Sequence, residues 1–84
     1  MTREEAIRII IEEKLKGYNL NEERDNKENE VVIKYENDNW IVYATDERAS
    51  SVSGSKKIFE TEDAAMDNLI KRLRADKAMR ELQL

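Results

Sequence analysis

The sequence predicts a small α+β domain in which a three-stranded antiparallel sheet packs against two helices, in the order α-β-β-β-α. Three observations predict it: a helical apolar pattern at each end, two β-type runs around a short Asn/Asp turn, and a third β-type run before the second helix. Eighty-four residues suffice for one domain, so we expect a single unit over residues 1–84. Covering one face of an antiparallel sheet with both helices is the simplest closure of these elements.

The first helix is predicted from a capping box that Thr2 begins and Glu5 completes. An apolar stripe at helical spacing follows and is broadened by Ile9. We expect Gly17 to be the left-handed residue just past the helix end. The members of the stripe are Ile7, Ile10, Ile11 and Leu15.

Residues 21–30 (NEERDNKENE) contain no hydrophobic side chain, and we expect a solvated, mobile connector there. Residues 31–35 and 40–45 carry strand signals on either side of the turn sequence ENDN, which is typical of a β-hairpin. The second strand of this hairpin places Trp40, Val42 and Ala44 on one face and Ile41, Tyr43 and Thr45 on the other. Neither face is fully polar, so the pattern leaves open which one packs on the helices.

A short strand is predicted over residues 57–60, after a serine-rich loop. Thr61 is the expected cap of the second helix, and acidic residues in the first turn favour the positive helix end. The buried stripe of this helix is Ala65, Met66, Leu69, Ile70 and Leu73. Because the stripe breaks after Leu73, we expect residues 78–84 to form a frayed tail or to pack on another surface.

The composition excludes several classes of chemistry. The chain has no cysteine and no histidine, which removes thiol catalysis, the commonest general base and the commonest metal ligand. We therefore expect no catalytic residue, no cofactor and no metal site. The net charge of −4 argues against nucleic-acid binding, and the charged N-terminal pattern is neither a signal peptide nor a membrane span. We expect a cytoplasmic protein with no membrane partner.

Two charged segments are candidate contact surfaces. Asp46, Glu47 and Arg48 follow the Trp40 strand, where such residues occur both in binding sites and on ordinary surface. The second half of the last helix is basic; its cations suit an acidic partner or a polyanion, but they also complement the helix dipole. These cations are Lys71, Arg72, Arg74, Lys77 and Arg80.

Two nucleotide-related alternatives are weaker. The serine-rich loop over residues 50–55 could cradle a phosphate, but it has one glycine and no helix directly after it, so a solvated loop is the simpler interpretation. The order αβββα also occurs in double-stranded RNA-binding domains. Glu60, Glu62 and Asp63 stand where those domains carry lysines, and they would repel phosphates.

Four short runs carry a resemblance to a known family. They are WIVY at residues 40–43, DERA at 46–49, KIF at 57–59 and EDAA at 62–65. Over roughly residues 31–73 the chain resembles the immunity protein 59 family of bacterial polymorphic toxin systems. The family pattern has a glycine after the arginine, where this chain has Ala49.

The resemblance implies a non-enzymatic inhibitor that neutralises a bacterial toxin by direct binding, as a monomer or weak homodimer. The alternative function is a phage-encoded or regulatory inhibitor or adaptor of a host nuclease or defence protein. A self-associating structural protein, which would use the apolar tail, is a third possibility. If the immunity reading holds, we expect the protein partner to contact Asp46, Glu47 and Arg48, together with Glu36 and Asp38 of the hairpin turn.

Overall fold

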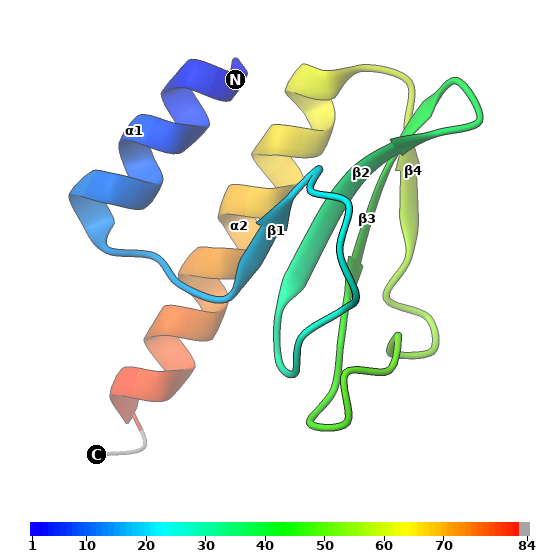
Figure 1. Ribbon diagram of the computed structural model, residues 1–84. Coiled ribbons are helices and arrows are strands. Elements are labelled where there is room, and N and C mark those ends of the chain that lie inside the picture. The colour runs from blue at the N-terminus through cyan, green and yellow to red at the C-terminus, as the bar shows by residue number, and fades with distance from the viewer. Residues whose placement is uncertain (83–84) are drawn as a thin grey trace.

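The structure, a computed structural model, describes residues 1–82. In order, its elements are α1 (Arg3–Glu13), β1 (Tyr18–Leu20), β2 (Val31–Glu36), β3 (Asn39–Ala44), β4 (Lys57–Phe59) and α2 (Glu62–Leu82). The strands form one sheet in the order β1-β2-β3-β4. α2 packs across β2, β3 and β4, and α1 packs against α2 (Figure 1). The predicted α+β class with two helices and a central hairpin is confirmed for this part of the chain.

The predicted three-stranded antiparallel sheet is wrong, because the sheet within residues 1–82 has four strands and is mixed. β2 pairs antiparallel with β3, and β3 with β4, as expected. The additional strand, β1, pairs in parallel with β2, so that Tyr18 lies opposite Val31 and Leu20 opposite Ile33. A three-residue strand is too short to show the alternation from which strands are predicted.

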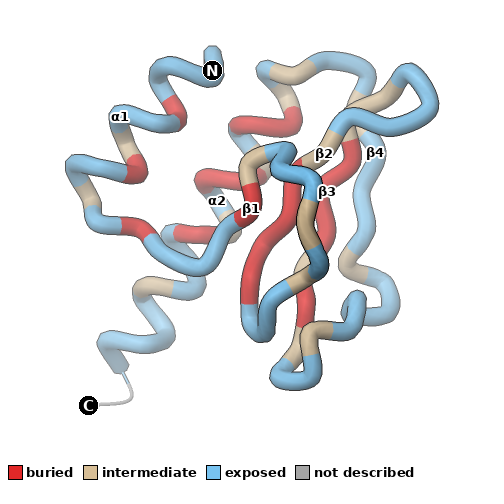
Figure 2. The backbone as a smooth tube through the Cα atoms, viewed as in Figure 1, coloured by how far each residue is buried: buried red, intermediate tan, exposed pale blue. Residues whose placement is uncertain are grey.

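The sheet buries apolar side chains on both of its faces. Val31, Ile33 and Val42 face the helices and join the main core, whereas Val32, Ile41 and Tyr43 form a smaller buried cluster of their own. Figure 2 shows the buried segments of β2 and β3 beside those of α2. The main core also contains Ala6, Ile10, Leu15, Ala65, Met66, Leu69, Ile70 and Leu73.

The first helix begins as predicted, but it ends earlier, and of its predicted stripe Ile10 and Leu15 are buried while Ile7 and Ile11 are exposed. The Thr2 hydroxyl accepts a hydrogen bond from the Glu5 backbone N–H at 3.2 Å. The left-handed residue that ends α1 is Lys14, with φ 54° and ψ 46°, rather than Gly17. Ala6 and Ile10 are buried, while Ile11 of the predicted stripe is 70% exposed. The buried face of α1, which contains Ala6 and Ile10, packs in the main core, and Ile11 lies on the exposed side of the helix.

α2 is continuous from Glu62 to Leu82, and its predicted cap and buried stripe are confirmed. Thr61 Oγ1 accepts from the Ala64 N–H at 3.2 Å. After Leu73 the helix turns mostly exposed side chains to its surroundings. The end of the predicted tail, residues 83–84, lies outside the described residues. Over residues 1–82, neither helix has the length and apolar character needed to cross a membrane.

Candidate functional site

The connector between β1 and β2 is organised by a buried ion pair. The Glu30 side chain is only 3% exposed, and its two carboxylate oxygens accept from Arg24 Nη1 at 3.1 Å and Nη2 at 2.8 Å. The Lys27 backbone N–H also donates to this carboxylate, at 2.9 Å. Burial raises the pKa of Glu30, but the hydrogen bonds from Arg24 and Lys27 outweigh it, so the pKa lies below its usual value.

Thr45 joins this connector to the end of β3. Its Oγ1 accepts from the Glu30 backbone N–H at 2.9 Å and donates to the Lys27 carbonyl at 2.7 Å. Next to it, the Tyr43 hydroxyl donates to Asn26 Oδ1 at 2.8 Å. The connector therefore lies against the face of the sheet that points away from the helices, where the smaller apolar cluster is. It also lies next to the turn that follows Thr45.

That turn carries three of the predicted contact residues. Asp46 Oδ1 accepts from the backbone N–H groups of Arg48 at 2.8 Å and Ser50 at 3.0 Å. Ala49 adopts φ 63°, in the left-handed region. Glu47 and Arg48 are exposed on this hydrogen-bonded turn, so their side chains project from a fixed backbone. They line a shallow hollow together with Asn26, Lys27, Glu28 and Ala49.

The other two predicted contact residues, Glu36 and Asp38, lie at the opposite end of the hairpin (Figure 1). The turn there has two residues, Asn37 at φ 53° and Asp38 at φ 65°, as in a type I′ turn. Lys34 pairs with the Glu36 carboxylate at 3.1 Å. The structure thus divides the five predicted residues between two ends of the sheet, separated by roughly 20 Å, the length of a six-residue strand.

An exposed aromatic ring stands beside the hairpin turn. Tyr35 is 52% exposed, and its ring centroid lies 5.2 Å from that of its cross-strand neighbour Trp40. Trp40 is half-buried and packs against the main core. Exposed aromatic rings are natural interface anchors, and Tyr35 is more exposed than Tyr18, which is 37% exposed.

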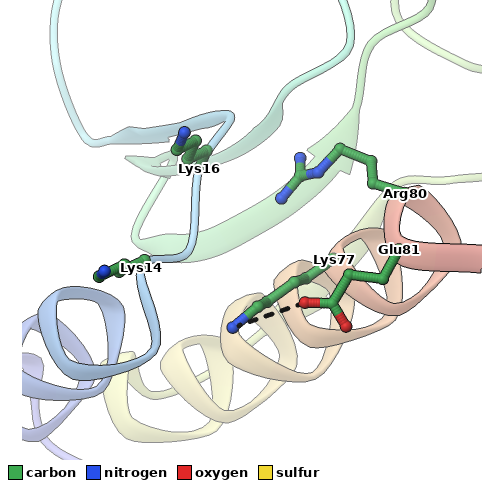
Figure 3. Close-up of a pocket in the computed structure, with 5 residues that line it drawn as sticks. All are labelled: Lys14, Lys16, Lys77, Arg80 and Glu81. Carbon is green, nitrogen blue, oxygen red and sulfur yellow. Dashed lines mark ion pairs between the residues drawn. The ribbon is translucent and has the colours of Figure 1, made fainter. Parts of the chain in front are cut away.

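A basic hollow that we did not predict lies between the end of α1 and the second half of α2. Lys14 and Lys16 come from the segment after α1, and Lys77, Arg80 and Glu81 come from α2. Figure 3 shows Lys77 and Arg80 extending from α2 toward the segment that carries Lys14 and Lys16. The sequence indicated the basic half of α2, but the meeting with Lys14 and Lys16 depends on how the two helices pack.

The described residues place exposed charged side chains at both ends of the β2–β3 hairpin and in the basic hollow. No group of three or more acidic side chains that could hold a metal ion occurs within residues 1–82. The strongest polar network in the described chain, around Glu30, holds the connector in place.

Comparison with known proteins gives one match. The family model described as Immunity protein 59 matches residues 3–82, which is nearly the whole chain. No curated protein and no solved structure matches.

Proposed function

The chain belongs to the immunity protein 59 family, and we propose that it is a non-enzymatic inhibitor that neutralises a cognate bacterial toxin by direct binding. The observation that carries this proposal is the extent of the family match, which includes both helices and all four strands of the described chain. Inhibition by contact also requires no catalytic group, and the composition supplies neither cysteine nor histidine.

The turn after β3 is the first place where we propose contact with the toxin. Glu47 and Arg48 are exposed on a turn that the Asp46 carboxylate already fixes through two backbone N–H groups. A surface that is fixed before binding loses less conformational entropy when a partner docks, which favours affinity. Asp46 thus acts in this proposal by holding the turn, and Glu47 and Arg48 by meeting the toxin.

The hairpin turn with Glu36 and Asp38 is proposed as the second place of contact. A protein interface of ordinary size covers about 800 Å² on each partner, which is wide enough to reach both ends of a sheet of this length. Acidic residues at both ends suit a basic toxin, because complementary charges raise the rate of association more than the affinity.

Co-expression tests the function. The chain is produced in bacteria together with each candidate toxin, namely each protein encoded next to it that arrests growth on its own, and growth is compared with cells that make the candidate alone. We expect growth to be restored and a one-to-one complex to be purified. Growth arrest despite normal levels of both proteins would refute the proposal.

Charge reversal tests the contact surface. The double variant E47K/R48E inverts the charges of two exposed side chains while leaving Asp46 and its two hydrogen bonds to the turn backbone intact. We expect slower association with the toxin and a changed dependence on salt, measured by surface plasmon resonance. The matched control is E12K/R8E on the exposed side of α1; equal effects of the two double variants would remove the turn from the interface.

A further inference from the structure

The basic hollow of Figure 3 differs in charge from the chain that contains it. Its lining has four cations and one carboxylate, whereas the whole chain has 19 acidic and 15 basic residues. Glu81 lies at the rim, where it meets Lys77 at 4.0 Å, the outer limit of an ion pair. Within residues 1–82, no ion pair is formed by Lys14, Lys16 or Arg80.

Helix-end electrostatics account for part of this charge, because Lys14 is the C-cap of α1 and Arg80 lies in the last turn of α2, where cations complement the helix dipole. Lys77 Nζ donates to the Glu13 carbonyl at 2.7 Å and so satisfies an acceptor at the end of α1. Arg74, outside the hollow, makes two hydrogen bonds to the Glu13 carboxylate, at 3.0 Å and 2.6 Å. The side chains of Lys14, Lys16 and Arg80 form no ion pair within residues 1–82, and Asp76 is a carboxylate on which the charge of Arg80 acts.

The backbone at Lys14 has a positive φ, as it has at five other non-glycine residues of the described chain. This residue holds the left-handed conformation that ends α1, where glycine is the usual residue because a Cβ is disfavoured there. The chain has glycine three positions later, at Gly17, which also has a positive φ. The left-handed conformation at Lys14 ends α1 and directs the chain toward β1.

We propose that this basic hollow receives the carboxylates of an acidic segment on a partner protein. Arg80 offers a planar guanidinium that can bind a carboxylate through two parallel hydrogen bonds, and Lys14 and Lys16 offer mobile ammonium groups on the facing segment. The hollow is open on one side, which suits an extended peptide. Its four cations are too few for the long phosphate track that a nucleic acid presents.

The test is a titration of the isotope-labelled full chain with a hexaglutamate peptide at pH 7 and low salt, followed by amide NMR. We expect saturable shifts that cluster at residues 14–16 and 77–81. The double variant K14S/K16S should bind the peptide about tenfold more weakly, which is the effect of losing two exposed charge contacts. The matched double variant K56S/K57S, which removes two exposed lysines near β4, should change the affinity less than twofold.

A third variant separates binding from folding. K14G removes one charge and also relieves the left-handed strain, so it should melt about 3–5 °C higher while binding the peptide more weakly. Equal losses in K14S/K16S and K56S/K57S would overturn the proposal, because they would show general attraction to lysines. Saturable binding of an RNA oligonucleotide at these residues, without binding of hexaglutamate, would overturn it as well. This test involves no toxin, so its outcome is independent of the toxin assay.

Discussion

Ala49 occupies a position whose backbone conformation favours glycine. Its φ of 63° lies in the left-handed region, which glycine adopts at no steric cost. The turn still forms in this chain because the Asp46 carboxylate and carbonyl accept hydrogen bonds from Arg48, Ser50 and Ala49 itself. The replacement A49G should therefore stabilise the protein.

The expected gain follows from two opposing terms. An L-residue in the left-handed conformation costs roughly 1–2 kcal/mol relative to glycine. Glycine in turn loses about 0.4–1 kcal/mol through the greater freedom of the unfolded chain. The difference is a gain of about 0.5–1 kcal/mol in the free energy of unfolding, which corresponds to a rise in Tm of roughly 3–6 °C for a domain of this size.

Thermal and urea unfolding, followed by circular dichroism, measure this gain. The control is A78G, because Ala78 is exposed in the interior of α2 and glycine there should cost about 1 kcal/mol. A loss of stability in A49G of the same size as in A78G would show that residue 49 does not hold the left-handed conformation, and would refute the description of the turn.

Three further predictions concern the core and the connector. T45V should lower the free energy of unfolding, measured with urea, by about 1–3 kcal/mol, because the buried Glu30 N–H loses its acceptor. An unchanged free energy of unfolding would contradict the hydrogen bond from the Glu30 N–H to Thr45. L69A should cost about 2–5 kcal/mol in the same assay, since Leu69 is fully buried in the main core, and a cost below 1 kcal/mol would contradict that placement. Because the pKa of Glu30 is lowered in the folded state, its stabilising contribution is present above pH 5 and is lost as the pH falls through the folded pKa. Stability measured from pH 7 to pH 3 should thus decline less steeply in E30Q than in the parent, and identical slopes would exclude Glu30 from the acid sensitivity.

The sequence predicted those parts of the fold that local periodicity determines. The stripe of α2, the Thr2 and Thr61 caps and the β2–β3 hairpin all depend on residues that are close in sequence, and the structure has each of them. β1 was missed because its pairing depends on neighbours far along the chain. The buried face of α1 could not be predicted from the positions of its isoleucines, because the buried pair Ala6 and Ile10 has the same spacing as the exposed pair Ile7 and Ile11.

The candidate surfaces were predictable to a lesser extent. A strand exit at Asp46 and a turn at Asp38 are visible in the sequence, and an antiparallel hairpin of this length puts them at opposite ends. The Arg24–Glu30 pair lies in a run of polar residues that contains several acids and bases. The sequence does not indicate which of these side chains is buried and paired. The basic hollow depends on α1 ending beside the second half of α2, which no local pattern indicates.

The central claim is that this chain neutralises a toxin by binding it. The most direct measurement is the activity of the purified toxin identified by the co-expression test, titrated with the purified chain. The account predicts complete inhibition at one equivalent and a one-to-one complex by light scattering. Full toxin activity in the presence of a large excess of folded chain would contradict it.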